Sequence, residues 1–176
     1  MLAHTAVREA EVAVANIIGK QDRMNYDAIP SVVYTNPEVS CVGKSEEEYY
    51  QAIAKTFLVS CDNAHALHPN HPEKTDAVNY VTMNDGIVIK ESANQKYTTD
   101  AFSRALFTGV CQNVNVPVQS FANRSDSVGG STLGNLSNTQ VSIHAVDFGL
   151  AQLAMHSCFE TAGVKDTEYA IIALKE

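Results

Sequence analysis

The chain has 176 residues, of which 45% are hydrophobic and 18% charged, so it suits one globular domain or two small ones and is not disordered over most of its length. Its 12 basic and 20 acidic side chains give a net charge of −8, which excludes the basic surface of a nucleic-acid-binding protein. No apolar run approaches the ~20 residues of a membrane span, residues 1–20 lack a signal-peptide pattern, and the four cysteines stand apart. We therefore expect a cytoplasmic protein with reduced thiols.

The first third of the chain predicts two helices and two short strands. Apolar residues recur at three- and four-residue spacing over 5–18, which predicts a helix that Gly19 ends. Short strands are expected before and after Pro37. Ser45 precedes three glutamates, the pattern of a capped helix that begins at Glu46 and runs to about Lys55.

From residue 56 onward, predicted strands and helices alternate. Strands are expected over 56–60, 86–90, 116–121 and 141–148, and helices over 99–112 and 166–175, the last capped by Asp166. A glycine-rich turn at 127–134 is expected to open a further helix. This alternation predicts an α/β fold of layered sheet and helices with a largely parallel sheet. The first 45 residues form a short helix-plus-strand extension to it.

Polar side chains follow the first of these strands in the segment 60–70. Asp62 and His65 are three residues apart, and a carboxylate with an imidazole suits Zn²⁺ or Mn²⁺. The alternative is a solvated surface loop. His156 follows an apolar run and is either a ligand or a histidine bonded to backbone, while Lys90 is either a charge for an anionic substrate or the first solvated residue after its strand. Tyr97 either donates a hydrogen bond or packs.

Residues 1–48 resemble the dihydrolipoamide dehydrogenase family of flavin disulfide reductases. The resemblance is carried by Met1-Leu-Ala-His4 and by Asn25-Tyr-Asp-Ala-Ile-Pro-Ser-Val-Val-Tyr-Thr-Asn-Pro-Glu-Val-Ser-Cys-Val-Gly43. In that family, the first motif lies beside the flavin and opens a helix, and the second motif opens the dimerisation domain. The family's nucleotide-binding glycines and redox cysteine pair are missing, and Cys41 matches neither redox cysteine. A reductase fragment is therefore the most remote of the functional interpretations.

Residues 49–176 resemble the carboxy-terminal part of the catalytic domain of M18-family metallo-aminopeptidases, the aspartyl aminopeptidase group. Six motifs occur in the family's order: Asp62-Asn-Ala-His-Ala-Leu-His-Pro-Asn70, Val88-Ile-Lys90, Asn94-Gln-Lys-Tyr-Thr-Thr-Asp100, Asn123-Arg-Ser-Asp126, Gly129-Gly-Ser-Thr-Leu-Gly134 and Gln152-Leu-Ala-Met-His-Ser157. The resemblance implies an incomplete metallopeptidase-type fold and a homo-oligomer. It also implies that Asp62 and His156 are ligands of a two-zinc centre, and that His65, Lys90 and Tyr97 contact a peptide whose first residue is acidic.

The remaining ligands and the general base of that family belong to sequence that this chain lacks, so no catalytic residue is assigned. Two functional interpretations remain open in addition to the remote one of a reductase fragment. One is a partial zinc aminopeptidase that is inactive alone. The other is a non-catalytic oligomerisation or interaction module, or an artefact of fusion near residues 44–50.

Overall fold

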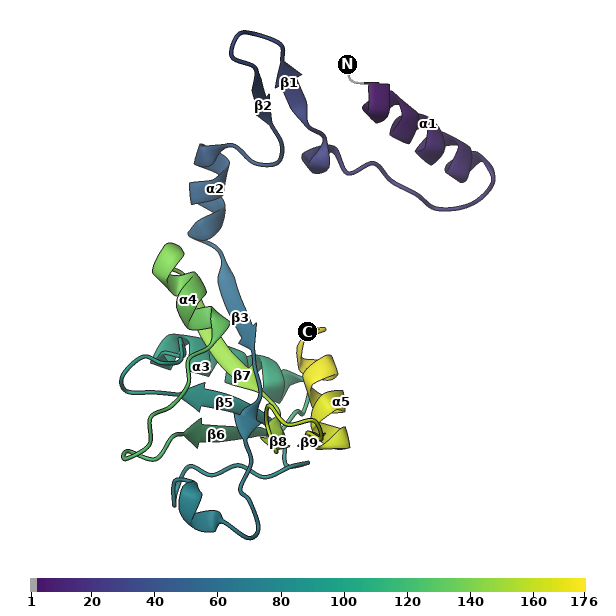
Figure 1. Cartoon of the computed structure of the whole chain (residues 1–176). Coiled ribbons are helices and arrows are strands. Elements are labelled where there is room, and N and C mark those ends of the chain that lie inside the picture. Colours follow the sequence, from purple (N-terminus) through teal and green to yellow (C-terminus); the bar gives the residue numbers. More distant parts are fainter. Residues whose placement is uncertain (1–2) are drawn as a thin grey trace. The chain divides into compact units, whose positions relative to one another are not determined.

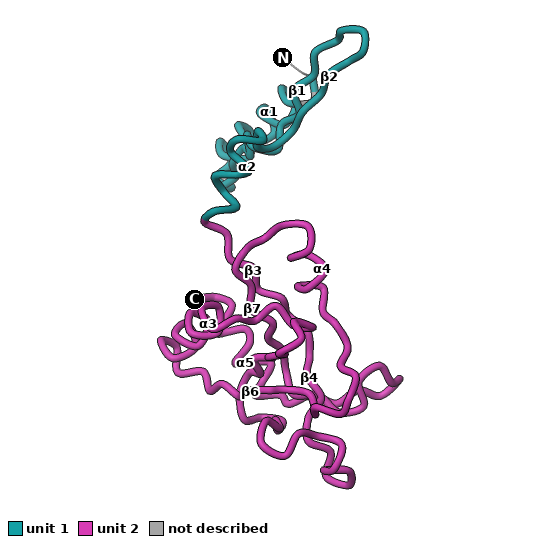
Figure 2. Tube along the Cα trace, turned by 90° about the vertical axis from the view of Figure 1, so that its left-hand side faces the viewer, with its two compact units in different colours: residues 1–54 teal, residues 55–176 magenta. Residues whose placement is uncertain are grey.

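The computed structural model describes residues 3–176 and divides the chain after Ala54 into two compact units, coloured separately in Figure 2. Met1 and Leu2 of the first resemblance motif lie outside the described residues, as does the side chain of His4. None of the described helices is long and apolar enough to cross a membrane.

The amino-terminal unit contains the elements that its sequence predicts. Helix α1 (Ala3–Ile17) is followed by a short 3₁₀ helix (Tyr26–Ala28), the antiparallel pair β1 (Ser31–Val33) and β2 (Val39–Cys41), and helix α2 (Glu46–Ile53). The predicted cap of α2 is confirmed: Glu48 N donates to Ser45 Oγ, and Ser45 N donates to the Glu48 carboxylate. No described residue of 3–54 is buried, so this unit lacks a hydrophobic core of its own.

The second unit, residues 55–176, has the mixed α/β character that the sequence predicts (Figure 1). Its helices are α3 (Ala101–Asn113), α4 (Leu133–Gln140), α5 (Val164–Ala173) and a 3₁₀ turn (Pro72–Lys74). Its strands are β3 (Phe57–Cys61), β4 (Ala64–His65), β5 (Ile87–Glu91), β6 (Val118–Ala122), β7 (His144–Gly149), β8 (Ala151–Leu153) and β9 (Thr161–Ala162).

The main sheet is mixed in direction rather than largely parallel. Its order is β3-β7-β5-β6, in which β3 and β7 are parallel, β5 and β6 are parallel, and β7 and β5 are antiparallel. A smaller sheet, β4-β8-β9, pairs β4 with β8 in parallel and β8 with β9 antiparallel. The four strands of this sheet are those that the sequence predicts. The antiparallel pairing of β7 and β5 departs from the largely parallel sheet expected, because direction depends on the path of each connection.

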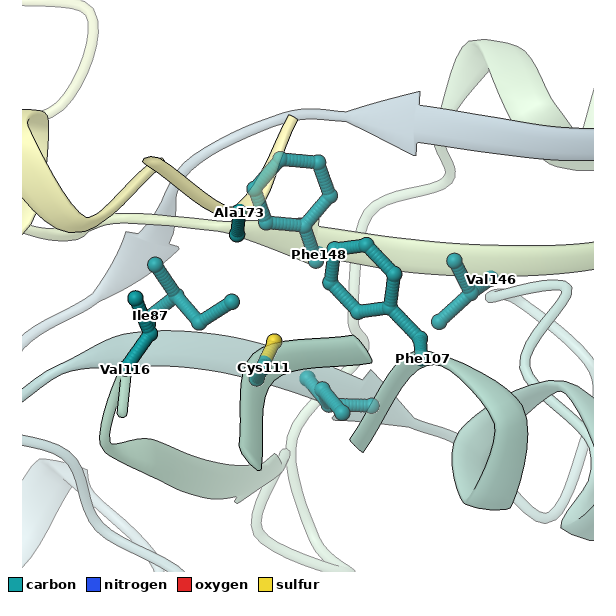
Figure 3. Packing of buried hydrophobic residues seen from close by; sticks show 8 residues of the cluster. Ile87, Phe107, Cys111, Val116, Val146, Phe148 and Ala173 are labelled. Atoms are coloured by element: carbon teal, nitrogen blue, oxygen red, sulfur yellow. The ribbon is translucent and has the colours of Figure 1, made fainter. Parts of the chain in front are cut away.

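Alternation along the strands divides the unit into two faces. Ile87 and Ile89 of β5, with Val146 and Phe148 of β7, point to one face, where α3 and α5 cover them (Figure 3). Each such fully buried side chain contributes about 1.5–3 kcal/mol relative to its exposed state. The residues that alternate with them along the strands, Val88, Lys90 and Asp147, therefore belong to the opposite face.

A second apolar cluster lies on the opposite face and supports the polar residues beside it. It contains Val88 with Ala64, Tyr97, Phe121 and Ala151, which come from both sheets and the loop before α3. Here the end of β3 passes very close to β7: a Cβ on Gly149 would collide with the backbone of Asp62. Glycine at this position lets Asp62 lie against the sheet.

The last helix does not begin where the sequence predicts. Its N-cap is Gly163, which has no side chain to make a capping hydrogen bond. Asp166 lies in the first turn of the helix and is fully buried. The Asp166 carboxylate accepts hydrogen bonds from Asn84 N (2.6 Å) and Gly86 N (3.0 Å) instead of capping its own helix. The predicted cap was wrong because a distant turn, invisible in the local pattern, offers better donors.

Candidate functional site

One cavity of about 630 Å³ is lined by all five residues that the sequence singles out. Asp62 follows β3, His65 ends β4, Lys90 lies in β5, Tyr97 precedes α3, and His156 follows β8. Other polar residues on its wall are His68, His71, Lys74, Asn123, Arg124 and Ser131. The ends of strands far apart in the sequence thus meet at one concave surface, as in other α/β sites.

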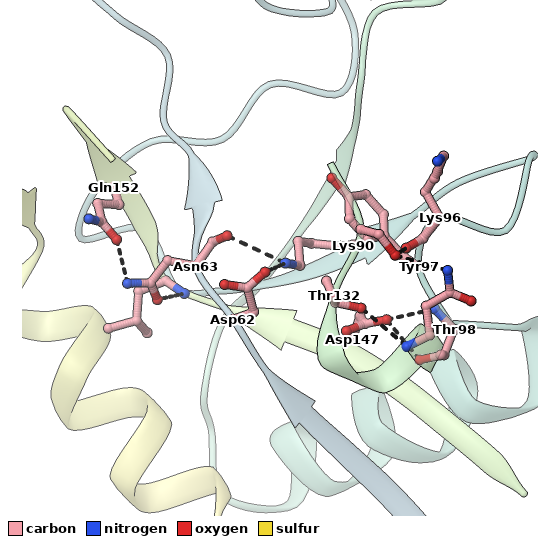
Figure 4. A network of polar contacts seen from close by, with 12 residues as sticks. Asp62, Asn63, Lys90, Lys96, Tyr97, Thr98, Thr132, Asp147 and Gln152 are labelled. Carbon is pink, nitrogen blue, oxygen red and sulfur yellow. Dashed lines mark hydrogen bonds and ion pairs between the residues drawn. The ribbon is translucent and has the colours of Figure 1, made fainter. Parts of the chain in front are cut away.

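Lys90 and Asp62 form the central ion pair of this cavity. Lys90 Nζ lies 2.9 Å from Asp62 Oδ2 and 3.4 Å from the carbonyl oxygen of Asn63 (Figure 4). The Lys90 side chain is 2% exposed and that of Asp62 is 53% exposed. Lys90 is therefore not the first solvated residue after its strand. It is a buried cation whose charge is balanced by a half-exposed carboxylate.

Tyr97 closes the other side of the Lys90 ammonium group. The ammonium nitrogen lies 4.9 Å from the centre of the Tyr97 ring, within the range of a cation–π contact. The Tyr97 hydroxyl accepts a hydrogen bond from Asn123 Nδ2 at 3.0 Å. Burial raises the pKa of Tyr97; the Asn123 bond opposes this, and the negative charges of Asp62 and Asp147 add to it. The phenol therefore keeps its proton at neutral pH and is available as a donor.

The two predicted histidines are more exposed than Lys90 and Tyr97. His65 and His156 are both exposed, and both line the cavity. His156 has a backbone φ of 66°, and its N–H donates to Glu160 Oε1 at 2.6 Å. A positive φ is uncommon for a residue other than glycine, so this carboxylate helps to hold the turn that presents the imidazole.

The described residues do not fit a complete two-metal centre. No group of three or more His, Cys, Asp or Glu side chains converges among them. Asp62 and His156 line the same cavity, but one oxygen of Asp62 is already engaged by Lys90. A zinc ion in a protein normally takes three or four protein ligands, so the described residues provide only part of such a set.

Asp147 is a residue of this region that sequence reasoning missed. It is fully buried in β7, and its Oδ2 accepts from both the backbone N–H (2.6 Å) and the hydroxyl (2.8 Å) of Thr98 (Figure 4). Its other oxygen has no hydrogen-bond partner in the described part of the chain and faces Gly134 in the first turn of α4. Asp147 thereby fixes the segment that carries Tyr97. A charged residue inside an otherwise buried strand was the available signal.

A second missed link joins the two segments that carry the predicted metal ligands. Asn63 Nδ2 donates to Gln152 Oε1, and Leu150 N donates to Asn63 Oδ1 at 3.0 Å. These bonds tie the segment after β3 to β8, which leads to His156. The sequence indication was an amide in each motif: Asn63 directly after Asp62, and Gln152 four residues before His156.

Comparison with known proteins identifies the family. The family model described as aminopeptidase I zinc metalloprotease (M18) matches residues 32–176. A probable M18 family aminopeptidase 2 from Clostridium novyi is 46% identical over 130 residues, which are 74% of this chain and 30% of the relative. One from Pseudomonas aeruginosa is 43% identical over 128 residues, 73% of this chain and 30% of the relative. The chain thus spans under a third of these curated relatives.

Solved structures agree with the sequence matches. An Ape4 chain in a complex with Nbr1 is 42% identical with a TM-score of 0.72, over 74% of this chain and 25% of Ape4. A dodecamer of mApe1 from Saccharomyces cerevisiae is 27% identical with a TM-score of 0.62, over 70% of this chain and 27% of that one. The family match begins at residue 32, inside the segment that resembles dihydrolipoamide dehydrogenase, and that second resemblance stays a prediction. The chain belongs to the M18 family of aminopeptidases.

Proposed function

We propose that this chain forms the carboxy-terminal part of the catalytic domain of a zinc aminopeptidase that removes acidic residues from the amino terminus of peptides. The observation that carries the proposal is the single cavity lined by Asp62, His65, Lys90, Tyr97 and His156. The M18 family supports the class of reaction, and the match to under a third of each relative supports a partial site.

The proposal assigns holding roles to the residues present. Asp62 and His156 contribute two ligands to a zinc centre whose other ligands and general base come from sequence outside this chain. Lys90 attracts the carboxylate of an acidic first residue: its ammonium carries three N–H donors, and Asp62 and the Asn63 carbonyl accept two of them. Tyr97 and His65 add hydrogen bonds from the wall of the cavity.

Because the general base and several ligands are missing, we expect the isolated chain to hydrolyse aspartyl and glutamyl substrates poorly or not at all. Loss of an acid–base group alone typically costs about 10²–10⁴-fold in rate. The dodecamer of mApe1 supports a further part of the proposal, that the complete protein works as a homo-oligomer. Its location in the cytoplasm stays a prediction.

The test separates peptide binding from hydrolysis. The chain is titrated calorimetrically with a peptide that begins with Asp and with one that begins with Asn, and both are then assayed for cleavage with added Zn²⁺. We expect tighter binding of the Asp peptide, a loss of roughly tenfold in Lys90→Gln from the removed charge, and little change in Lys165→Gln, an exposed lysine of α5 outside the cavity. Equal binding of both peptides would count against the acidic preference and favour a non-catalytic module.

A further inference from the structure

The Lys90 ammonium occupies a site that resembles a cation-binding site in its own right. A carboxylate oxygen lies 2.9 Å away, a carbonyl oxygen 3.4 Å away, and an aromatic face 4.9 Å away, and the side chain is almost completely shielded from solvent. Each of these groups carries negative charge or the negative face of a ring. A desolvated lysine needs such partners, because burial of an unpaired charge is costly.

Lys90 has little freedom to leave this position. It lies inside β5, which is hydrogen-bonded to β6 on one side and to β7 on the other, and its direct pairing partner is Phe121. Its neighbours Val88 and Ile89 are fully buried, so the strand is held on both faces. The ammonium is consequently a fixed charge close to Asp62 rather than a surface lysine that can swing away.

A divalent ion bound by Asp62 would meet this fixed charge. The ion would share a carboxylate with the ammonium, at a separation of a few ångströms from it, and like charges at that range repel, the more so because the ammonium is itself buried. Asp62 also loses part of its electron density to the hydrogen bond from Lys90. Both effects lower the affinity of Asp62 for a metal ion.

We propose that Lys90 is the cation held by Asp62 in this chain and that it competes with divalent metal ions for that carboxylate. The inference rests on the proposed role of Asp62 as a metal ligand. It goes beyond that role because it assigns Lys90 an effect on metal occupancy, separate from substrate recognition.

The test is a double-mutant cycle on Zn²⁺ affinity, measured by isothermal titration calorimetry on the full chain. Its members are the unmodified chain, Asp62→Asn, Lys90→Met and the double variant. Lys90→Met keeps the length of the side chain and removes its charge. Any Zn²⁺ held elsewhere, for example by the exposed His68 and His71, is common to all four and cancels.

We expect Lys90→Met to tighten Zn²⁺ binding by about tenfold or more, as removal of a fixed like charge at this distance should do. Asp62→Asn should weaken Zn²⁺ binding by at least about tenfold in the Lys90→Met background and by under about twofold in the unmodified chain. Lys74→Met is the matched control, a lysine on the same cavity wall that is exposed, and it should change the affinity by under about twofold.

The outcomes separate the two proposals. If Asp62→Asn weakens Zn²⁺ binding equally in both backgrounds, Asp62 is a ligand and the competition with Lys90 is refuted. If Asp62→Asn changes the affinity in neither background, the ligand role and the competition are both refuted. Thermal melts by circular dichroism verify that each variant folds, and Lys90→Gln replaces Lys90→Met in the cycle if the latter does not.

Discussion

Replacement of Asp166 by alanine should destabilise the second unit more than most changes far from the cavity. The Asp166 carboxylate is fully buried and accepts two backbone hydrogen bonds, from Asn84 (2.6 Å) and from Gly86 (3.0 Å). Those donors belong to the turn that leads into β5, which carries Lys90. Gly163 leaves the space for this contact, since a Cβ there would meet the Asp166 carboxylate.

The size of the effect follows from the contacts that are lost. A hydrogen bond to a charged group contributes about 1.5–3 kcal/mol, and a buried donor left without a partner costs about 1–3 kcal/mol. Two such bonds to one carboxylate, with Gly86 buried and Asn84 exposed, give an expected loss of about 3–5 kcal/mol. A small domain is stable by only about 5–15 kcal/mol, so the unit should approach instability.

The measurement is urea-induced unfolding followed by circular dichroism, with Glu168→Ala as the control. Glu168 lies two residues further along the same helix and is exposed, so its replacement should change the unfolding free energy by less than about 0.5 kcal/mol. Asp166→Asn should also be destabilising, because its amide turns one acceptor into a donor. A loss below about 1 kcal/mol in Asp166→Ala would refute the role of this carboxylate as the anchor of the turn.

Three further outcomes are expected. Burial raises the pKa of the Cys111 thiol to about 11, so an aromatic disulfide reagent at pH 8 should modify the exposed Cys41, Cys61 and Cys158 and reach Cys111 only on unfolding. The folded state keeps the Cys111 thiol proton, so the thiol's contribution to stability is complete below its unfolded pKa near 8.5 and is lost as the pH rises toward 11. Over that range the unfolding free energy of Cys111→Ala should therefore fall less than that of the unmodified chain. Trypsin should cut the unit 3–54, whose described side chains are all at least partly exposed, before residues 55–176; early loss of the latter would contradict this.

Elements governed by neighbours in sequence were predictable. The cap of α2 depends on Ser45 and Glu48, three residues apart, and the strand β5 follows from a short run of β-branched residues. The five candidate site residues came from motif resemblance, and the structure brings them to one cavity. Each of these features is set by local chemistry or by a pattern that local residues carry.

Features governed by distant partners were not predictable. The Asp166 carboxylate bonds to a turn about half the chain away, and β7 lies antiparallel to β5 because of how its connection returns to the sheet. Asp147 lies within a predicted strand, and nothing in that pattern shows that its carboxylate holds Thr98, the residue after Tyr97. No periodicity encodes such pairings, because both partners must be placed before either has a role.

The pairing of β3 with β7 also governs the order in which the protein can fold during its synthesis. Phe57 of β3 aligns with His144 of β7, and in the main sheet β3 is hydrogen-bonded to β7 alone among the described strands. At roughly 5–20 residues per second, β3 leaves the ribosome about 4 to 17 s before its partner. During that interval β5 and β6 can pair, but β3 stays open to chaperones or to wrong partners. Asp62 and His156 can therefore meet only after β7 and β8 have been synthesised.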